Sequence, residues 1–347
     1  MRLVATVAIA ILAAASGGAT LASCSGSSPR PVGTADVAFA GSLLKVDDQY
    51  VGPAFGRSTG LHYTGRGGGS FGLANEITAG EIRPGVFESV GSAPIAPLEP
   101  RFTRYYVQFA SSPIVIAYNP HSRYAGLFAA VAGHRAPLSR VFTAMAEPGF
   151  RLGRTNPATD PQGQAFVMMI ELAQRYLGLP AGIVPAILGA GAAAPGGGNQ
   201  AQIFSETSLD AHLEAGQLDA ASAFKSQAIQ YHLPYVALPA AIDMGDPSFA
   251  AAYAAVSIEV PGALGPDGRQ STTTVRGSPL VIDITTIREP GETPSDAKAA
   301  AAFVAFVLST SGRALYARAG LHLLPERLYG NSTAVPRQIE AGLRSTG

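Results

Sequence analysis

The sequence predicts an α/β fold in which each domain has a mainly parallel sheet flanked by helices. Short apolar runs typical of strands alternate with longer runs typical of helices along most of the chain. Two of these strand-to-helix steps, within residues 36–45 and 60–79, have glycine and serine at the turn. The chain has 347 residues, which is enough for two domains.

The N-terminal segment is expected to lie outside the fold. Met1-Arg2 precede an apolar run at residues 3–15, which is shorter than the about 20 residues of a membrane span and typical of a secretory signal. Leu21-Ala22-Ser23-Cys24 resembles a bacterial lipobox, and an ordinary signal peptide with an incidental cysteine is the alternative. We expect residues 1–23 to be a lipoprotein signal peptide, Cys24 to carry the lipid anchor and residues 24–35 to be a flexible tether.

Two strand–turn–helix units follow the tether. Residues 37–39 are predicted to be a buried strand, Ala40-Gly41-Ser42 the turn, and the residues from Leu43 onward a helix. In the second unit, residues 60–64 are the strand, the glycine run to Ser70 is the turn and residues 73–79 are the helix. The first N–H groups of a helix lack helical partners and its dipole favours negative charge, so such turns bind anions. Two of them on neighbouring units predict one shared anion site.

The remaining elements are predicted from periodicity and capping residues. Asp160-Pro161 has the residue types of an N-cap and first helical residue, ahead of a long amphipathic helix at residues 165–177. Thr207 and Asp210 have capping-box spacing in a helix that opens at Ser205 and ends near Gly216. Strands are predicted at residues 85–91, 105–110, 114–118, 220–224, 235–238 and 279–284, a hairpin at 257–275 around a turn at 266–268, helices from 127 and at 296–319, a loop at 189–198, and a surface tail.

Composition excludes several classes of function. The formal net charge is zero, which argues against a nucleic-acid or anionic-membrane surface. One cysteine excludes a disulfide framework and a cysteine-based metal site, and the six histidines have no metal-ligand spacing. The glycine run is not followed by Lys-Ser or Lys-Thr, as a phosphate-binding P-loop requires. We therefore expect no cofactor.

A serine hydrolase is the catalytic alternative. Gly68-Gly69-Ser70-Phe71-Gly72 matches the G-x-S-x-G nucleophile elbow, and Asp160 and His232 follow in the order of a catalytic triad. The strand before the elbow is half polar, whereas a central hydrolase strand is nearly all apolar. No HGGG-type oxyanion loop precedes it. An elbow at Ser70 is thus the weaker hypothesis.

Ser42, Ser70, Asp160 and Glu206 each stand at a predicted helix N-terminus. As simple caps or dipole partners they would contribute ~0.5–2 kcal/mol each. A family resemblance assigns them a further role. It is carried, in chain order, by these segments: Ala40-Gly41-Ser42-Leu43, Gly69-Ser70, Asp160-Pro161-x-Gly163, Glu206-Thr207, residues 214–219, residues 230–235 and residues 278–284.

Together these segments resemble the tungstate/molybdate-binding lipoproteins of ABC importers, which have the two-lobed type II periplasmic-binding-protein fold. The resemblance covers most of residues 36–325 and implies a non-enzymatic binding protein on the outer face of the cytoplasmic membrane. It implies a permease and its ATPase as partners. It places the anion among Gly41, Ser42, Ser70, Asp160, Pro161, Gln162 and Glu206. The tyrosine that the family has in the following strand is Phe224 here.

Two carboxylates beside an anion conflict with simple electrostatics, because like charges repel in a partly buried site. The resemblance implies that Asp160 and Glu206 approach the Mo or W atom itself and raise its coordination from four to six. Sulfur cannot expand its shell in this way, so the two carboxylates would repel sulfate. The sequence does not rank tungstate above molybdate.

The resemblance also implies how the lobes divide the chain. The first lobe is expected to combine residues 36–118 with residues 284–347, which include the tail, and the second lobe is expected to be residues 119–283. Ser42 and Ser70 would then belong to the first lobe, and Asp160 and Glu206 to the second. The two crossings near residues 111–118 and 275–284 would form the hinge, so that anion binding closes the cleft.

Overall fold

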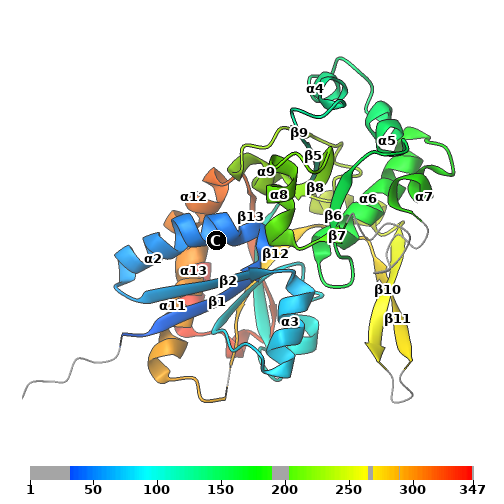
Figure 1. Ribbon diagram of the computed structural model, residues 1–347. Coiled ribbons are helices and arrows are strands. Elements are labelled where there is room, and N and C mark those ends of the chain that lie inside the picture. The colour runs from blue at the N-terminus through cyan, green and yellow to red at the C-terminus, as the bar shows by residue number, and fades with distance from the viewer. Residues whose placement is uncertain (1–31, 190–202, 265–268, 289, 346–347) are drawn as a thin grey trace, which may run out of the picture. The chain divides into compact units, whose positions relative to one another are not determined.

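The computed structural model describes residues 32–189, 203–264, 269–288 and 290–345. The predicted signal peptide, Cys24, the tether up to residue 31, most of the loop at 189–198 and the turn at 266–268 lie outside the described residues. The described chain forms two β-sheets and a two-stranded hairpin, with helices packed against the sheets (Figure 1).

The first sheet has six strands, and four of them run in the same direction. Their order is β13 (His322–Gly330), β4 (Tyr105–Ser111), β12 (Val281–Thr286), β3 (Val86–Val90), β1 (Thr34–Ala40) and β2 (His62–Gly68). β1 pairs in parallel with both β2 and β3, whereas β12 is antiparallel to β3 and β4, and β13 is antiparallel to β4.

The second sheet has five strands, in the order β7 (Ile203–Phe204), β6 (Leu152–Thr155), β8 (Ala220–Phe224), β5 (Ile114–Tyr118) and β9 (Tyr235–Val236). Only β5 runs against the others, being antiparallel to β8 and β9. Both sheets are thus mainly parallel in strand direction, as predicted. Their pairing is mixed because β5 enters directly from β4 of the first sheet, and β12 directly from the hairpin strand β11, in each case without a crossover helix.

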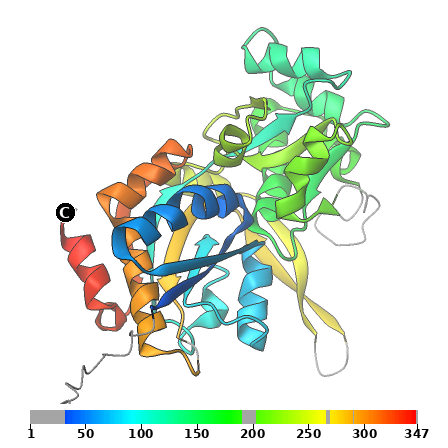
Figure 2. The ribbon, with the colours of Figure 1, turned by 60° about the vertical axis from the view of Figure 1, so that its left-hand side comes forward.

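The predicted hairpin is confirmed as β10 (Ser257–Leu264) and β11 (Gln270–Arg276), an antiparallel pair (Figure 2, yellow). The helices are α1 (Leu44–Val46), α2 (Gly52–Thr59), α3 (Ser70–Ala79), α4 (Ala125–Ala132), α5 (Ser139–Met145), α6 (Pro161–Leu177), α7 (Ile183–Leu188), α8 (Glu206–Glu214), α9 (Lys225–Gln230), α10 (Ala250–Tyr253), α11 (Pro294–Leu308), α12 (Thr310–Arg318) and α13 (Arg337–Ser345).

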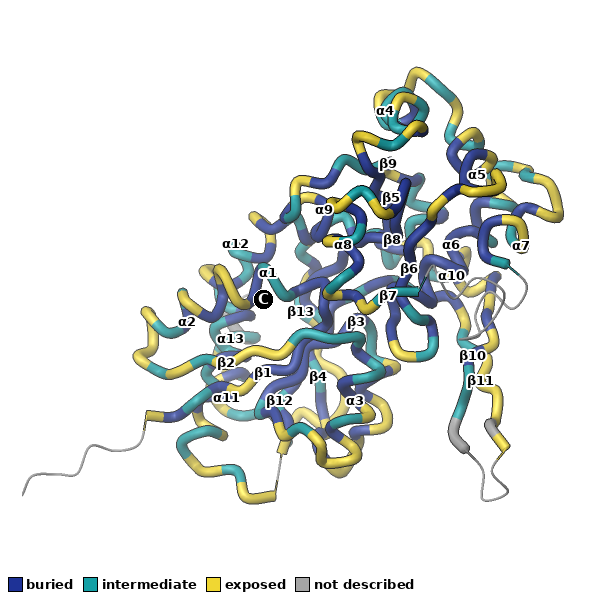
Figure 3. The backbone as a smooth tube through the Cα atoms, in the orientation of Figure 1, coloured by how far each residue is buried: buried dark blue, intermediate teal, exposed yellow. Residues whose placement is uncertain are grey.

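Helices cover both faces of the first sheet. α11 packs on β1 and is itself covered by α13, while α3 packs against β1 and β3 with a hydrophobic cluster of its own. The strands between them are buried (Figure 3). No single described helix is long and apolar enough to cross a membrane; α11 and α12 meet that test only as a pair bent by 64°.

Two short segments connect the first sheet to the second sheet and to the hairpin. Ser112-Pro113 joins β4 to β5, and residues 277–280 join β11 to β12. Backbone hydrogen bonds tie them together: Ser112 N–H donates to Leu280 O at 3.2 Å, and Leu280 N–H donates to Met244 O at 2.7 Å. The expected division at residues 118 and 283 therefore differs from the sheets, because β5 belongs to the second sheet and β12 to the first.

The C-terminal segment differs from its prediction in two ways. The helix expected at 296–319 is divided at Ser309, whose side chain accepts the Gly312 N–H and so caps α12. The tail is not merely surface, because β13 pairs along β4 as an edge strand and Ile339 of α13 is fully buried. β13 carries too little alternation of apolar residues to be recognised from sequence.

Candidate functional site

The first serine turn leads directly from β1 into a continuous helical run, residues 41–59. Ser42 is buried and its backbone N–H donates to Glu206 Oε1 at 2.9 Å. A Cβ on Gly41 would lie 2.6 Å from Glu206 Oε2, so only glycine lets the carboxylate approach this turn without displacement. The first predicted helix start therefore faces the second of the two predicted carboxylates.

The second serine turn is shorter than predicted. β2 continues through the glycine run to Gly68, and α3 begins at Ser70, so only Gly69 forms the turn. A Cβ on Gly69 would lie 2.6 Å from the Thr159 carbonyl oxygen and 3.2 Å from Asp160 Cβ. The Gly72 N–H also donates to Thr159 O at 3.1 Å. This turn is therefore packed against the residues that precede α6.

Asp160 is the N-cap of α6 and Pro161 is the first helical residue, as predicted. Asp160 Oδ1 accepts the Gln162 N–H at 2.8 Å, while Oδ2 is buried without a hydrogen-bond partner. Gly163 completes the motif because a Cβ there would lie 2.5 Å from Thr155 O. One carboxylate oxygen of Asp160 thus caps α6, and the other has no hydrogen-bond partner among the described residues.

Glu206 is the first residue of α8, after Ser205. The capping box predicted for Thr207 and Asp210 is wrong, because the N-cap is Ser205 and its side chain does not cap the helix. Glu206 is 4% exposed, and its Oε2 is buried without a hydrogen-bond partner.

The two carboxyl groups are held in an unfavourable environment for charge. Burial raises the pKa of Asp160, opposed by the hydrogen bond from the Gln162 N–H. Burial raises the pKa of Glu206 well above its usual value, and the nearby charge of Asp160 raises it further, against the N–H groups of Ser42 and Gly41. Such perturbed groups concentrate at functional sites.

These residues border a pocket of about 320 Å³. It is lined by Gly68, Gly69, Asn156, Thr159, Asp160, Ile203, Phe204, Ser205, Glu206 and Thr207. Two buried atoms without a hydrogen-bond partner belong to its lining, Asp160 Oδ2 and Glu206 Oε2. Native folds rarely leave such atoms unsatisfied, so they indicate a place for a ligand or water. The hydroxyl groups of Thr155 and Ser42 lie close enough to these carboxyl groups to lower the pKa of Asp160 and of Glu206, respectively. No lysine or arginine is among the described residues that line it.

Of the predicted site residues only Asp160 and Glu206 line this pocket; the six that do not are Gly41, Ser42, Ser70, Pro161, Gln162 and Phe224. Ser70 is fully buried, and its Oγ accepts the Val90 N–H at 3.2 Å. The Gln162 side chain points to the second sheet, donating to Gln227 Oε1 at 2.7 Å. Phe224 is 1% exposed and packs in the hydrophobic core, while its N–H donates to Gln227 Oε1 at 3.0 Å. Gln227 therefore joins the backbone of Phe224 to the start of α6.

Sequence reasoning missed the wall formed by Asn156, Thr159 and residues 203–205. Asn156 has a recognisable signal, because its side chain accepts the Ala158 N–H at 3.0 Å in an Asx turn. The contribution of Thr159 is a backbone carbonyl, and residues 203–205 form a two-residue strand with the N-cap of α8. Neither the Thr159 carbonyl nor the short strand at 203–204 can be recognised from the pattern of side chains in the sequence.

The structure gives no support to a nucleophile elbow at Ser70. An elbow exposes its serine Oγ on a strained turn above the sheet. Ser70 instead opens α3, is fully buried, and is not among the described non-glycine residues with positive φ.

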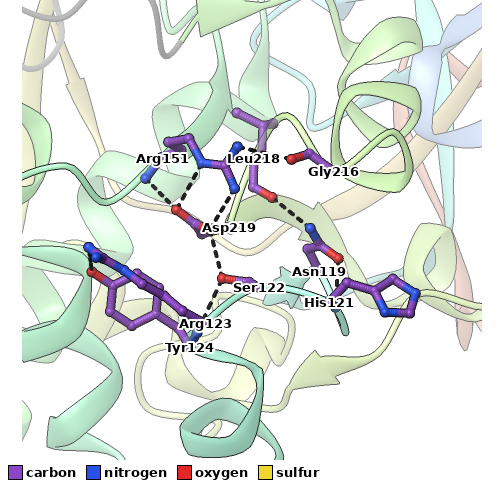
Figure 4. A network of polar contacts seen from close by, with 9 residues as sticks. All are labelled: Asn119, His121, Ser122, Arg123, Tyr124, Arg151, Gly216, Leu218 and Asp219. Atoms are coloured by element: carbon purple, nitrogen blue, oxygen red, sulfur yellow. Dashed lines mark hydrogen bonds and ion pairs between the residues drawn. The ribbon is translucent and has the colours of Figure 1, made fainter.

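A second polar cluster, centred on Asp219, lies elsewhere in the second sheet (Figure 4). Arg151 holds Asp219 through two side-chain hydrogen bonds of 2.8 and 3.2 Å, and Ser122 donates to Asp219 Oδ1 at 2.6 Å. These hydrogen bonds hold the pKa of Asp219 below its usual value, against the effect of its burial. Both Asp219 oxygens are satisfied, which indicates a structural ion pair that fixes the start of β8.

Known proteins resemble this chain in sequence and in fold. The family described as bacterial extracellular solute-binding protein matches residues 35–322. A putative ABC transporter molybdenum-binding protein of Haloferax volcanii is 33% identical over 177 residues, covering 51% of this chain and 49% of that protein. The molybdate/tungstate-binding protein WtpA of Pyrococcus abyssi is 30% identical over 260 residues, covering 70% and 68%. The chain thus matches about half of the Haloferax protein's length.

Among solved structures, the periplasmic molybdate-binding protein of Azotobacter vinelandii aligns with a TM-score of 0.50 at 17% identity, covering 84% of this chain and 99% of that one. The sulfate-binding protein SubI of Mycobacterium tuberculosis also reaches 0.50, at 12% identity and 91% and 92% coverage. These likenesses show the fold, the two-lobed type II periplasmic-binding-protein fold. With a family match that spans most of the described residues, this chain belongs to the bacterial extracellular solute-binding proteins.

Proposed function

We propose that this chain captures a tetrahedral oxyanion, tungstate or molybdate, for import by an ABC permease and its ATPase. One observation carries the proposal. Asp160 and Glu206 line one small pocket, each has a buried carboxylate oxygen without a hydrogen-bond partner, and Glu206 accepts the N–H of the Ser42 turn. The names of the Haloferax and Pyrococcus relatives support the choice of ligand.

In the proposed site the helix starts bind the oxygens of the ligand, and the two carboxylates bind its Mo or W atom. The oxyanion's oxygens receive hydrogen bonds from the helix starts at Gly41-Ser42 and Ser70. The free oxygens of Asp160 and Glu206 approach the Mo or W atom and complete a six-coordinate shell. Sulfate and phosphate cannot accept these two additional oxygens, so the carboxylates repel them.

Pro161, Gln162 and Phe224 take supporting roles in this proposal. Pro161 fixes the backbone at the start of α6, and Gln162 binds Gln227, which also accepts the Phe224 N–H. The family's tyrosine hydroxyl is absent at Phe224, which removes one donor to the anion. The ligand then depends more strongly on the serine turns and on the two carboxylates.

Transport needs no catalytic step by this chain in the proposed role. The hinge is the pair of segments at Ser112-Pro113 and residues 277–280, and binding of the anion between the two sheets closes the cleft. Signal-peptide processing and lipidation at Cys24 would hold the protein outside the cytoplasmic membrane.

Thermal melting with tungstate, molybdate, sulfate and phosphate tests the proposal. An anion that binds only the folded state at about 100 times its dissociation constant stabilises it by ~2.7 kcal/mol. We expect a rise in Tm with tungstate or molybdate and none with sulfate. A rise with sulfate would contradict the role of the carboxylates, and no rise with any of the four would contradict the proposed ligand class.

Charge-removing variants locate the binding to the pocket. Asp160→Asn is the sharpest, because asparagine also caps a helix and α6 keeps its hydrogen bond to Gln162 N–H. Glu206→Gln keeps the shape of the other carboxylate. Both variants should melt like the wild type without ligand and lose the tungstate effect, whereas Asp48→Asn, an exposed aspartate outside the pocket, should retain it.

A further inference from the structure

A second and larger concavity lies beside the oxyanion pocket. Its volume is about 660 Å³, against about 320 Å³ for the pocket of Asp160 and Glu206. Residues of the first sheet, of helices α3, α6 and α10, of the hairpin and of the crossing at 277–280 line it. We call it the arginine groove, after Arg276 and Arg327 in its wall.

Arg276 and Arg327 supply the positive charge of the groove. Arg276 ends β11 and Arg327 lies on β13, opposite Gln108 of β4 in the sheet register. Both are exposed, and neither guanidinium group forms a hydrogen bond or ion pair with another residue that the structure describes. No aspartate or glutamate is among the described residues that line the groove. Its wall therefore carries two uncompensated positive charges in a chain of zero formal net charge.

The remainder of the groove is mostly apolar. Phe71, Met168, Met244 and Leu280 contribute to it, and the Tyr329 ring, 37% exposed, stacks on Tyr106 with ring centroids 5.0 Å apart. Ligand sites for small molecules have this character: some hundreds of Å³, apolar walls and a few polar groups that fix orientation. Guanidinium groups bind carboxylate and sulfonate oxygens in a bidentate manner.

We propose that the arginine groove is a second binding site, which takes an organic anion with an aromatic or other apolar body and a carboxylate or sulfonate group. The apolar body contacts Met168, Met244 and Tyr329, and Arg276 and Arg327 hold the charged group. The volume and apolar walls do not suit a bare tetrahedral oxyanion, whose oxygens need hydrogen bonds on all sides.

The groove and the oxyanion pocket have no described lining residue in common, although both reach the starts of α3 and α6. Phe71 follows Ser70 at the start of α3, and Pro161 follows Asp160 at the start of α6. The two sites can therefore be separated experimentally, because substitutions in the arginine groove leave Asp160 and Glu206 unchanged.

The probe is 1-anilinonaphthalene-8-sulfonate, an aromatic sulfonate whose fluorescence rises in apolar surroundings, titrated into the folded protein at low ionic strength. We expect saturable binding at one site per chain. Arg276→Ala and Arg327→Ala should each weaken binding about tenfold. Arg57→Ala, an exposed arginine outside the groove, is the matched control and should bind like the wild type.

A blocking variant tests the location without removing charge. Ala93 is exposed and lines the groove, so Ala93→Trp fills it with little disturbance of the core. This variant should lose the probe, while its tungstate response and melting temperature stay those of the wild type. Unchanged binding in Arg276→Ala and Arg327→Ala, or in Ala93→Trp, would overturn the proposal, as would absence of saturable binding to the wild type. Because tungstate is measured separately, failure of the oxyanion proposal would be distinguished from failure of this one.

Discussion

Two buried carboxyl groups, those of Asp47 and of Glu88 on β3, predict that the stability of the fold falls as pH rises. Tyr316 Oη lies 2.6 Å from Asp47 Oδ1 and 3.0 Å from Glu88 Oε2, and all three residues are fully buried. The hydroxyl has one hydrogen and can donate to only one carboxyl, so the other contact requires a proton on a carboxyl group. Burial raises the pKa of both groups, and the charge of Asp47 further raises that of Glu88.

The sign of the effect follows from these raised pKa values. The unfolded chain releases both protons near the ordinary values of 3.8 and 4.5, whereas the native pair retains at least one. The stabilisation is therefore complete below about pH 4 and is lost as pH rises toward the folded pKa values. Each retained proton costs about 1.4 kcal/mol of unfolding free energy per pH unit, which is large beside a total of about 5–15 kcal/mol.

Urea unfolding at about pH 5.5 and about pH 7.5 measures this slope. In Asp47→Asn/Glu88→Gln we expect the loss of stability with pH to be smaller than in the wild type by about 1.4 kcal/mol per unit. Asp210 and Asp283, whose burial raises the pKa of each to about 7, are present in both proteins and cancel in the difference. Glu81→Gln, an exposed glutamate outside this cluster, is the control and should keep the wild-type slope. Equal slopes in the double variant and the wild type would refute the reasoning.

Three further predictions follow from single contacts. Gly41→Ala should weaken tungstate binding at least about tenfold in calorimetry, because its Cβ would lie 2.6 Å from Glu206 Oε2 and displace that carboxylate. Lys45 joins the two lobes, because its Nζ donates to the Gln230 carbonyl at the end of α9 and lies 4.8 Å from the Tyr231 ring centroid. Lys45→Met should therefore speed tungstate release about fivefold in stopped-flow experiments. Unchanged release would exclude Lys45 as a contact that holds the closed form. Arg151→Met should lower stability by about 1–3 kcal/mol without affecting tungstate, because Asp219 would stay buried with fewer donors.

The sequence was sufficient for those parts of the site that depend on local rules. Asp160 followed by Pro161 is a helix start in any fold, and the structure confirms it. Strand-to-helix steps with a small turn residue likewise placed Ser42 and Ser70 at helix N-termini. Here the hydrogen-bonding needs of a few consecutive residues decide the conformation.

Parts that depend on distant partners could not be predicted from patterns. The glycine run at residues 65–68 looks like a tight turn, yet it is strand, because it pairs in parallel with β1. Glycine is required there by close packing: a Cβ on Gly65 would lie 2.4 Å from Tyr63 Oη and one on Gly67 2.9 Å from the Phe39 ring. The predicted hydroxyl ligand at Ser70 already accepts the Val90 N–H from β3. The edge strand β13 is defined by its pairing with β4 rather than by its own residues.

The coordination number of bound tungsten tests the central claim most directly. X-ray absorption at the tungsten edge distinguishes a tetrahedral ion with four oxygens from an expanded shell. In the protein saturated with tungstate we expect six oxygens, two of them lost in Asp160→Asn/Glu206→Gln, because the free Oδ2 and Oε2 atoms complete the shell. Four oxygens in the wild type would contradict the account, since Asp160 and Glu206 would then face the anion as uncompensated charges and could not select it over sulfate.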